Sequence, residues 1–306
     1  MRDVTGKTAF ITGGASGIGL GMAEAFLTAG MNVVISDIRD DHLEAARAKL
    51  AEAGLVRQTS FLSLDVTDRA AYWRAADEAE AAFGRIDVLC NNAGIGILRS
   101  LADATHADWD WAVDVNLTGV FNGLKAILPK IRKHGQGGHI VNTASMAGIL
   151  QYSRAGIYVA TKFAVVGLTE ALRADLAPEG IGVSAFCPGG VRSNIRDHEK
   201  TRPARFSESE DAGSAPPAPS PSLQLSAEDR ERLSHLTATP EEAGRLVLQG
   251  IRDNALYIFT APEFRQGVEE RFDAIRRALG HDDERERTAL DLIPSLVGSP
   301  IYREAP

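Results

Sequence analysis

The strongest constraint on the fold is an alternation of short β-branched runs with longer amphipathic stretches, which extends from Lys7 to about Ile195. Alternation of this kind is typical of βαβ units, in which a helix connects two parallel strands of one sheet. Most of the runs are apolar on both faces, as expected for strands that helices cover on each side. The sequence therefore predicts an α/β protein with a doubly wound, seven-stranded parallel sheet and helices on both faces.

The runs and stretches place the expected elements along the chain. Strands are expected over residues 8–12, 32–36, 60–64, 86–90, 139–143, 181–186 and 256–260. Helices are expected over residues 17–29, 42–53, 69–83, 107–133, 158–176, 240–252 and 262–279. We expect a single domain over residues 1–280 and a C-terminal extension over residues 281–306.

A proline-rich segment from Ser207 to Ser226 interrupts this pattern before the alternation resumes. The segment has few apolar residues, so burial would not offset the entropy that is lost when such a chain becomes ordered. Long segments of this kind often form mobile loops near active sites. We therefore expect a mobile substrate lid over about residues 190–238.

Composition excludes several classes of protein for this chain of 306 residues. The net charge is -8, whereas a surface that binds nucleic acid needs a basic excess. No apolar stretch approaches the ~18 residues of a membrane span, and residues 1–12 lack the pattern of a secretion signal. Cys90 and Cys187 are too few for a disulfide scaffold, and the seven histidines lack metal-binding spacing. We expect a cytoplasmic protein that requires no metal, membrane or nucleic acid.

A glycine-rich turn with the sequence TGGASGIG directly follows the first expected strand, at residues 12–19. Glycines let the backbone turn sharply and approach a ligand, and the next helix begins with free amides and a positive dipole end. The turn predicts a pyrophosphate site, although the spacing GxxxGxG also suits a plain tight turn. The residues expected at the phosphates are Gly13, Ser16, Gly17, Ile18 and Gly19.

Asp37 ends the second expected strand, 18 residues after Gly19. A carboxylate at this point can accept hydrogen bonds from the adenosine ribose of a dinucleotide and repels a 2′-phosphate. Two alternatives are that Asp37 is a turn or helix-capping residue and that Arg39 receives such a phosphate. The glycine turn contains no basic residue, so the pattern favours NAD over NADP.

Two further expected strands end in segments that fit a nucleotide site. Asp65 and Val66 follow the third strand, and the sequence NNAG follows the fourth, at residues 91–94. The carboxyl ends of strands line the ligand crevice of a doubly wound sheet. Each segment alone is also typical of a turn. We expect Asp65, Val66, Asn92, Ala93 and Gly94 to contact the dinucleotide or support the glycine turn.

Tyr158 and Lys162 lie four residues apart on an expected helix and therefore share one face of it. Ser145 follows an expected strand, and Asn116 lies in the long helix before that strand. A tyrosine has a pKa of about 10, and a base that works near neutrality needs this lowered by ~2 to 3. A cation about 4 Å away is worth ~4 kcal/mol at an effective dielectric near 20, which would be enough. We expect a charged Lys162 to lower the pKa of Tyr158 in a proton-transfer site.

Together and in this order, these motifs resemble the short-chain dehydrogenase/reductase family. The resemblance covers residues 7–193 and includes TGxxxGxG, NNAG, Asn116, Ser145, YxxxK and Pro188-Gly189. It implies a Rossmann-type fold and an NAD(P)-dependent oxidoreductase that transfers a hydride directly between nicotinamide and a substrate carbon. Tyr158 would then be the general acid or base, and Ser145 would hydrogen-bond the substrate oxygen. Lys162 would hold the nicotinamide ribose, and Asn116 a water that connects Lys162 to solvent.

The resemblance also implies that the segment after the sixth expected strand contacts the nicotinamide. The expected contacts are Pro188, Gly189, Val191 and Ser193. The chain departs from the family here, because the family often has a threonine that reaches the carboxamide, and Ser193 is expected to replace it. Members of the family are typically oligomeric, so a homodimer or homotetramer is expected.

Apolar residues near the catalytic motifs predict a bulky, neutral alcohol as substrate, unless they belong to the ordinary core. They are Ile95, Ile97, Met146, Ile149 and Leu150. Four arginines around the expected lid could capture a carboxylate, or Asp197 and Glu199 could neutralise them. They are Arg192, Arg196, Arg202 and Arg205. Residues 193–195, 202–204 and 253–258 are similar to bacterial dehydrogenases that oxidise benzylic alcohols of lignin-derived aryl ethers.

Three functions remain open from the sequence. The favoured function is an NAD-dependent dehydrogenase or ketone reductase for a bulky secondary alcohol, including an aromatic one. The alternatives are an NADP-dependent biosynthetic carbonyl reductase and a dinucleotide-binding sensor or scaffold without turnover. The presence of all four catalytic residue types argues against the sensor.

Overall fold

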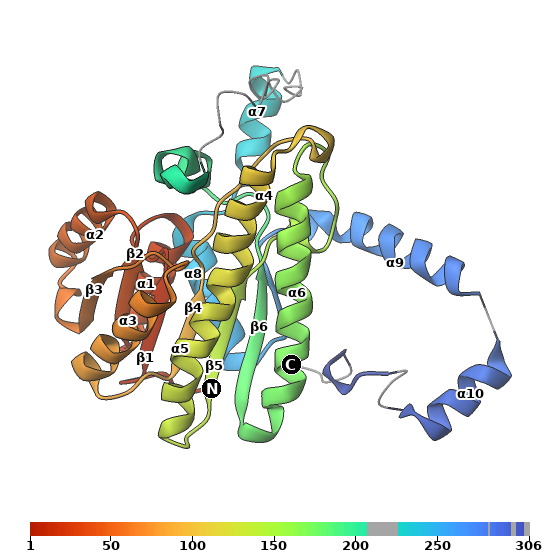
Figure 1. Ribbon diagram of the computed structural model, residues 1–306, viewed down its shortest axis with the longest axis horizontal. Helices are drawn as coiled ribbons and strands as arrows, with labels where there is room; N and C mark the ends of the chain where they lie inside the picture. Colours follow the sequence, from red (N-terminus) through yellow and green to blue (C-terminus); the bar gives the residue numbers. More distant parts are fainter. Residues whose placement is uncertain (207–225, 281, 295–297, 303–306) are drawn as a thin grey trace. The chain divides into compact units, whose positions relative to one another are not determined.

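A computed structural model describes residues 1–206, 226–280, 282–294 and 298–302 (Figure 1). Most of the proline-rich segment predicted as part of a lid lies outside these residues. The chain divides into two compact units, Met1–Ala261 and Pro262–Pro306. The sequence instead placed a domain end at residue 280, and that boundary stays a prediction.

The first unit contains the predicted seven-stranded parallel sheet, in the order β3-β2-β1-β4-β5-β6-β7. The strands are β1 (Thr8–Thr12), β2 (Asn32–Asp37), β3 (Thr59–Ser63), β4 (Val88–Asn91), β5 (Gly138–Thr143), β6 (Ile181–Cys187) and β7 (Tyr257–Phe259). The order reverses between β1 and β4, which opens a crevice at the carboxyl ends of these strands. The predicted doubly wound, Rossmann-type fold is therefore confirmed.

Helices cover both faces of the sheet because its strands are apolar on both faces. One face packs against α1 (Gly17–Thr28), α2 (Asp40–Glu52) and α8 (Pro240–Asp253). The other packs against α3 (Arg69–Phe83), α5 (Gly119–Lys133) and α6 (Gly156–Leu176), with α5 and α6 in front of the strands in Figure 1. Successive side chains of β1 point to opposite faces of the sheet. Ala9 and Ile11 pack on the face covered by α1, α2 and α8, and Phe10 packs on the face covered by α3, α5 and α6.

Helices α1 and α8 approach each other backbone to backbone. A Cβ atom on Gly21 would lie 1.9 Å from the carbonyl oxygen of Pro240, and one on Gly244 would lie 2.0 Å from that of Gly21. No side chain fits at either position. This packing fixes α1, and with it the glycine turn that precedes the helix.

The predicted helix over residues 107–133 differs from the structure in its middle. It consists of α4 (His106–Val113), a π-helix at Asp114–Thr118 and α5. A π-turn places one extra residue in the helical ladder and often marks a functional site. Here the π-turn contains the buried Asn116, whose side chain bonds the backbone of Ile95 instead of facing solvent.

Two helices were not predicted. Helix α7 (Ala227–Ser234) lies within the expected lid, and α10 (Asp283–Leu292) forms from a charge run, with Asp282 capping its first turn. Neither has the apolar periodicity that identifies a packed helix. The second unit also contains α9 (Arg265–Leu279), three residues shorter than predicted. No helix in the described part of the chain is long and apolar enough to cross a membrane.

Candidate active site

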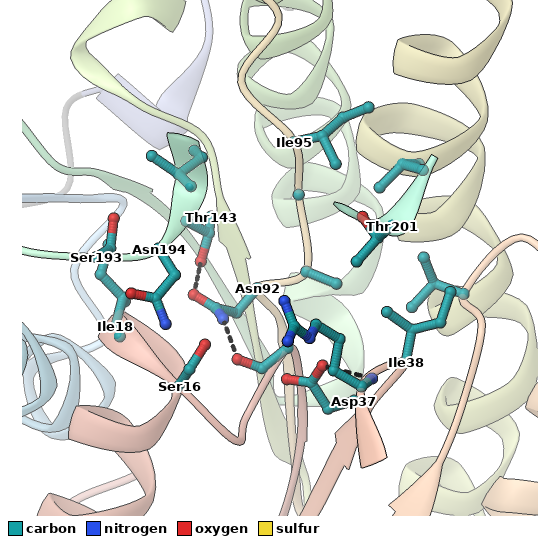
Figure 2. Close-up of a pocket in the computed structure, with 18 of the residues that line it drawn as sticks. Ser16, Ile18, Asp37, Ile38, Asn92, Ile95, Thr143, Ser193, Asn194 and Thr201 are labelled. Atoms are coloured by element: carbon teal, nitrogen blue, oxygen red, sulfur yellow. Dashed lines mark hydrogen bonds between the residues drawn. The ribbon is translucent and has the colours of Figure 1, made fainter. Parts of the chain in front are cut away.

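A pocket lies at the carboxyl ends of the central strands and brings most of the predicted site residues together (Figure 2). The predicted residues that line it are Gly13, Ser16, Gly17, Ile18, Asp37, Asp65, Val66, Asn92, Ala93, Gly94, Tyr158, Lys162, Pro188 and Ser193. In Figure 2, Ser16, Ile18, Ser193 and Asn194 lie on one side of it, and Ile95 and Thr201 on the other. The pocket extends from the end of β2 to the start of α6.

Three residues predicted to contact the cofactor do not line the pocket. Gly19 lies beneath the turn, where a Cβ atom would be 2.1 Å from the Gly13 carbonyl oxygen. The N–H of Gly189 donates to Oγ1 of Thr260 at 3.0 Å, and Val191 forms a bridge with Ala238. These residues shape the backbone around the pocket instead of facing it.

Other lining residues were not predicted. They are Ile38, His42, Leu64, Thr67, Trp111, Val115, Thr143, Ala144, Asn194, Ile195, Thr201 and Pro203. Arg39, considered above as an alternative site for a 2′-phosphate, also lines the pocket. Thr143 and Ala144 could have been found, because they stand at a strand end like the predicted residues. Trp111 and Val115 reach the pocket through the packing of α4 and the π-turn, for which the sequence carries no local signal.

The glycine turn has the geometry of a phosphate cradle. Gly13 and Gly17 have φ angles of 58° and 48°, a left-handed conformation that favours glycine. Nδ2 of Asn92 donates to the carbonyl oxygens of Thr12 and Gly13 at 3.0 and 3.1 Å and so holds the turn against β4 (Figure 2). Ser16 precedes α1 without a side-chain capping bond, which leaves the first amides of the helix available for an anion. These features fit a pyrophosphate.

Asp37 closes the pocket at the end of β2. Its carboxylate is 8% exposed and accepts the backbone N–H groups of Ala15 and Arg39 at 3.3 and 3.1 Å. Burial raises the pKa of Asp37 above its usual range. The Arg39 side chain instead donates through Nε to Oδ1 of Asp41 at 2.9 Å. Asp37 and Arg39 both line the pocket, and the guanidinium of Arg39 is bound to Asp41.

The hydroxyl of Tyr158 is hydrogen-bonded to the side chain of Ser145. Ser145 Oγ also accepts the N–H of Ala147 at 3.1 Å, which fixes the hydroxyl at the end of β5. The amine of Lys162 lies 5.7 Å from the centre of the Tyr158 ring and donates to the carbonyl oxygen of Thr143 at 2.8 Å. Tyr158, Ser145 and Lys162 therefore form one buried polar cluster.

The expected lowering of the Tyr158 pKa by Lys162 is wrong. Burial raises the pKa of Tyr158, and the hydrogen bond from Ser145 is what opposes it. Lys162 is itself 3% exposed, and burial lowers its pKa to about 8. A cation about 4 Å away would be worth ~4 kcal/mol, whereas the Lys162 amine is bound to the Thr143 carbonyl oxygen and lies 5.7 Å from the centre of the Tyr158 ring.

Asn116 has a different set of partners from the predicted water. Its Oδ1 accepts the N–H of Ile95 at 2.8 Å, and its Nδ2 donates to the Ile95 carbonyl oxygen at 3.0 Å and to Oγ1 of Thr161 at 3.2 Å. Its Oδ1 and the Lys162 amine lie 3.2 and 3.5 Å from the position a Cβ atom would take on Gly94. Asn116 thus anchors the loop after β4 beside Lys162, and its predicted role in a water relay stays a prediction.

Lys162 makes stability depend on pH in a defined direction. Its pKa is about 8 in the folded protein and 10.5 in the unfolded chain, so the unfolded chain binds more protons between these values. Charging the buried amine lowers stability, and this loss disappears as pH rises through that window. We expect the free energy of unfolding of the wild type, relative to Lys162→Met, to rise by about 3 kcal/mol across it. Urea unfolding of both proteins across this pH range tests the prediction, and a pH-independent difference would contradict it.

The described residues contain no group of three or more histidine, cysteine, aspartate or glutamate side chains that could hold a metal. Cys90 and Cys187 are free and buried. Burial raises the pKa of both thiols. Neither cysteine lines the pocket.

The fold and the pocket define a class of protein: a doubly wound α/β protein with a pocket that suits a dinucleotide at the carboxyl ends of its central strands. Residues 7–204 match the family described as short chain dehydrogenase. The chain therefore belongs to the short-chain dehydrogenase family, as the order of its motifs predicts. It is an oxidoreductase that acts on alcohol or ketone substrates and binds a nicotinamide dinucleotide.

Three similar proteins extend this result. The chain is 38% identical over 282 residues to the C alpha-dehydrogenase of Sphingobium sp. strain SYK-6. The alignment covers 90% of this chain and 87% of that protein. A short-chain dehydrogenase/reductase from Burkholderia phymatum, solved in complex with NAD, is 34% identical with a TM-score of 0.80, over 92% of this chain and 99% of that one. The apo form of LigO from the same Sphingobium strain is 36% identical with a TM-score of 0.75, over 100% of both chains.

Proposed function

We propose that this protein is an NAD-dependent dehydrogenase for a bulky, aromatic secondary alcohol, with Tyr158 as general base. The observation that carries the proposal is the continuous pocket that both Asp37 and Tyr158 line. Ser145 does not line the pocket itself but hydrogen-bonds Tyr158. The carboxylate of Asp37 can accept hydrogen bonds from the adenosine ribose. The hydroxyl of Tyr158 can hydrogen-bond the oxygen of an alcohol. A dinucleotide bound between them would present its nicotinamide beside that oxygen.

The chemistry follows from the polar cluster. Tyr158, as the phenolate, takes the hydroxyl proton of the alcohol, and Ser145 donates a hydrogen bond to the substrate oxygen as it becomes a carbonyl. The nicotinamide supplies the acceptor for the hydride that leaves the carbinol carbon. Lys162, whose amine donates to the carbonyl oxygen of Thr143, would hold the nicotinamide ribose. Ketone reduction is the same set of transfers in reverse.

The end of β2 supports NAD as the cofactor. A 2′-phosphate on the ribose would meet the buried carboxylate of Asp37, while Arg39, which could neutralise that phosphate, is bound by Asp41. The Burkholderia phymatum structure with NAD is consistent with this choice. Both aspartates therefore disfavour NADP. Asp37 repels the 2′-phosphate, and Asp41 binds the guanidinium of Arg39 that could otherwise neutralise it.

Changing these aspartates should alter cofactor preference in two steps. Asp37→Ala removes the repulsion, and we expect the ratio of kcat/KM for NAD over NADP to fall about a hundredfold. Adding Asp41→Ala should lower the ratio further, because Arg39 becomes free to bind the 2′-phosphate. Asp41→Ala alone is the matched control and should keep the preference for NAD within about threefold. A ratio that is unchanged in the double variant would contradict this assignment.

The substrate end of the pocket supports a bulky, apolar alcohol. Ile95, Trp111, Val115, Ile195 and Pro203 line it. Of the apolar wall predicted from sequence, Ile95 lines the pocket, whereas Ile97, Met146 and Ile149 are buried in the protein. The 38% identity to the C alpha-dehydrogenase is consistent with an alcohol as substrate.

Two of the predicted arginines have protein partners, which argues against capture of a carboxylate. Arg202 pairs with Asp108, and Arg205 donates to Oγ1 of Thr67. Neither of them lines the pocket.

The proposal is tested by mixing the purified protein with NAD and 1-phenylethanol and recording the absorbance of reduced nicotinamide. We expect NADH and acetophenone in equal amounts. A protein that binds NADH but forms no product from aryl secondary alcohols or ketones would instead be the sensor considered above. Rates that are higher with NADP would favour the biosynthetic reductase.

A further inference from the structure

We propose that Arg202, Asp108 and Trp111 form a clasp that holds residues 199–206 over the substrate end of the pocket and thereby sets the preference for large over small alcohols. This inference rests on the proposed function. None of the comparisons assigns a role to these residues. The clasp joins the loop after β6 to helix α4, two segments far apart in the sequence.

The ionic part of the clasp is buried. The side chain of Asp108 is 1% exposed and that of Arg202 is 11% exposed, and Nη2 of Arg202 donates to Oδ1 of Asp108. Nη1 of Arg99 lies 2.7 Å from the other carboxylate oxygen. Oγ1 of Thr105 accepts the N–H of Asp108 at 3.1 Å, so the carboxylate stands on the capped first turn of α4. The buried carboxylate of Asp108 thus binds two guanidinium groups, one on each oxygen, and ties the arginine of the loop to helix α4.

The apolar part of the clasp is the packing of the Arg202 side chain against the ring of Trp111. The guanidinium of Arg202 lies 4.7 Å from the centre of the Trp111 ring, and its Nη1 donates to the carbonyl oxygen of Phe206 at 2.9 Å. Phe206 is 8% exposed and packs in a cluster with Ile95, Ile157 and Trp111. Arg202 therefore fixes both its own position and the buried aromatic residue four positions later.

The clasp acts on the pocket through neighbouring residues. Thr201 and Pro203 stand on either side of Arg202 and line the pocket, and so does Trp111 beneath the guanidinium. Neither Arg202 nor Asp108 lines it. Arg202 is thus a positioning residue: it holds three parts of the pocket wall in one arrangement without lining the pocket itself.

A rigid wall favours substrates large enough to contact it. A bulky aryl alcohol gains contacts with Trp111 and Pro203 only while these residues are held in place, since otherwise binding must order the loop. A small alcohol reaches Tyr158 without these contacts. Loosening the clasp should therefore affect the large substrate selectively.

The test compares Arg202→Met with a matched control, using 1-phenylethanol and 2-propanol as substrates. We expect Arg202→Met to lower kcat/KM for 1-phenylethanol about tenfold, chiefly through KM, and to change the value for 2-propanol less than about threefold. Glu199→Gln removes the exposed carboxylate that lies 3.1 Å from Nε of the same arginine, and it should leave both values nearly unchanged. Equal losses with both alcohols, or no loss, would overturn the proposal. Arg202→Lys keeps a cation for Asp108 and should give an intermediate loss if Arg202→Met does not fold.

Hydrogen exchange tests the clasp without turnover. The N–H groups of Arg202 and Phe206 donate to the carbonyl oxygens of Glu199 and Pro203 at 3.2 and 2.9 Å. In Arg202→Met these two amides should exchange about tenfold faster, while the dissociation constant for NADH stays within about twofold. Unchanged exchange would overturn the clasp even if no alcohol is oxidised. Faster exchange in a protein without alcohol oxidation would instead support the clasp and refute the proposed function.

Discussion

Tyr158→Phe should lower kcat/KM for alcohol oxidation about a thousandfold, with little change in the dissociation constant for NADH. The substitution removes one oxygen from the buried cluster and leaves the ring in place. Without that oxygen no group at this position can accept the alcohol proton, and Ser145 loses its hydrogen-bond partner. Steady-state rates and fluorescence titration with NADH provide the two measurements.

Tyr152→Phe is the matched control for this experiment. Tyr152 influences the pKa of Tyr158 electrostatically, but its side chain is 37% exposed and does not line the pocket. We expect its activity to stay within about threefold of the wild type. If both variants lost activity to the same extent, Tyr158 would not be the proton acceptor. If Tyr158→Phe kept its activity, the proposed mechanism would be wrong.

Gly19→Ala should raise the dissociation constant for NADH at least about a hundredfold. The new methyl group would lie 2.1 Å from the Gly13 carbonyl oxygen and 2.8 Å from Nδ2 of Asn92, so the turn must move. That movement breaks the hydrogen bonds by which Asn92 holds the cradle. Thermal unfolding with and without NADH reports both effects, because the stabilisation by the ligand disappears with its affinity.

Gly167→Ala makes the same chemical change where the chain has room. Gly167 lies in α6, and a Cβ atom there would meet nothing within 4 Å. Alanine is the better helix former by about 1 kcal/mol, so this variant should bind NADH normally and unfold at a slightly higher temperature. Normal binding by Gly19→Ala would show that the turn is not the phosphate site.

Much of the fold could be predicted because its signals are local. Strand β1 and helix α3 have the predicted bounds, since an apolar run and an amphipathic repeat each begin and end at clear breaks. The π-turn at Asn116 could not be predicted, because it depends on the backbone of Ile95, which is distant in sequence. Local periodicity favours one uninterrupted helix there.

The positions of the site residues could also be predicted from local signals, but their electrostatics could not. Gly13, Asp37 and Lys162 could be placed from strand ends and helical spacing, and all three line the pocket. The direction of the Tyr158 pKa shift could not be predicted, because the pKa of a buried phenol depends on desolvation and on the partners that tertiary structure provides. The sequence shows Lys162 four residues from Tyr158, but not that its amine donates to Thr143.

The most direct test of the central claim uses 1-phenylethanol that carries deuterium at the carbinol carbon. After incubation with NAD and the wild-type protein, mass spectrometry of the reduced cofactor should show one deuterium per nicotinamide, formed at a rate that Tyr158→Phe nearly abolishes. Loss of the deuterium to water, or equal labelling rates in the two proteins, would contradict a mechanism in which the hydride passes to nicotinamide while Tyr158 takes the proton.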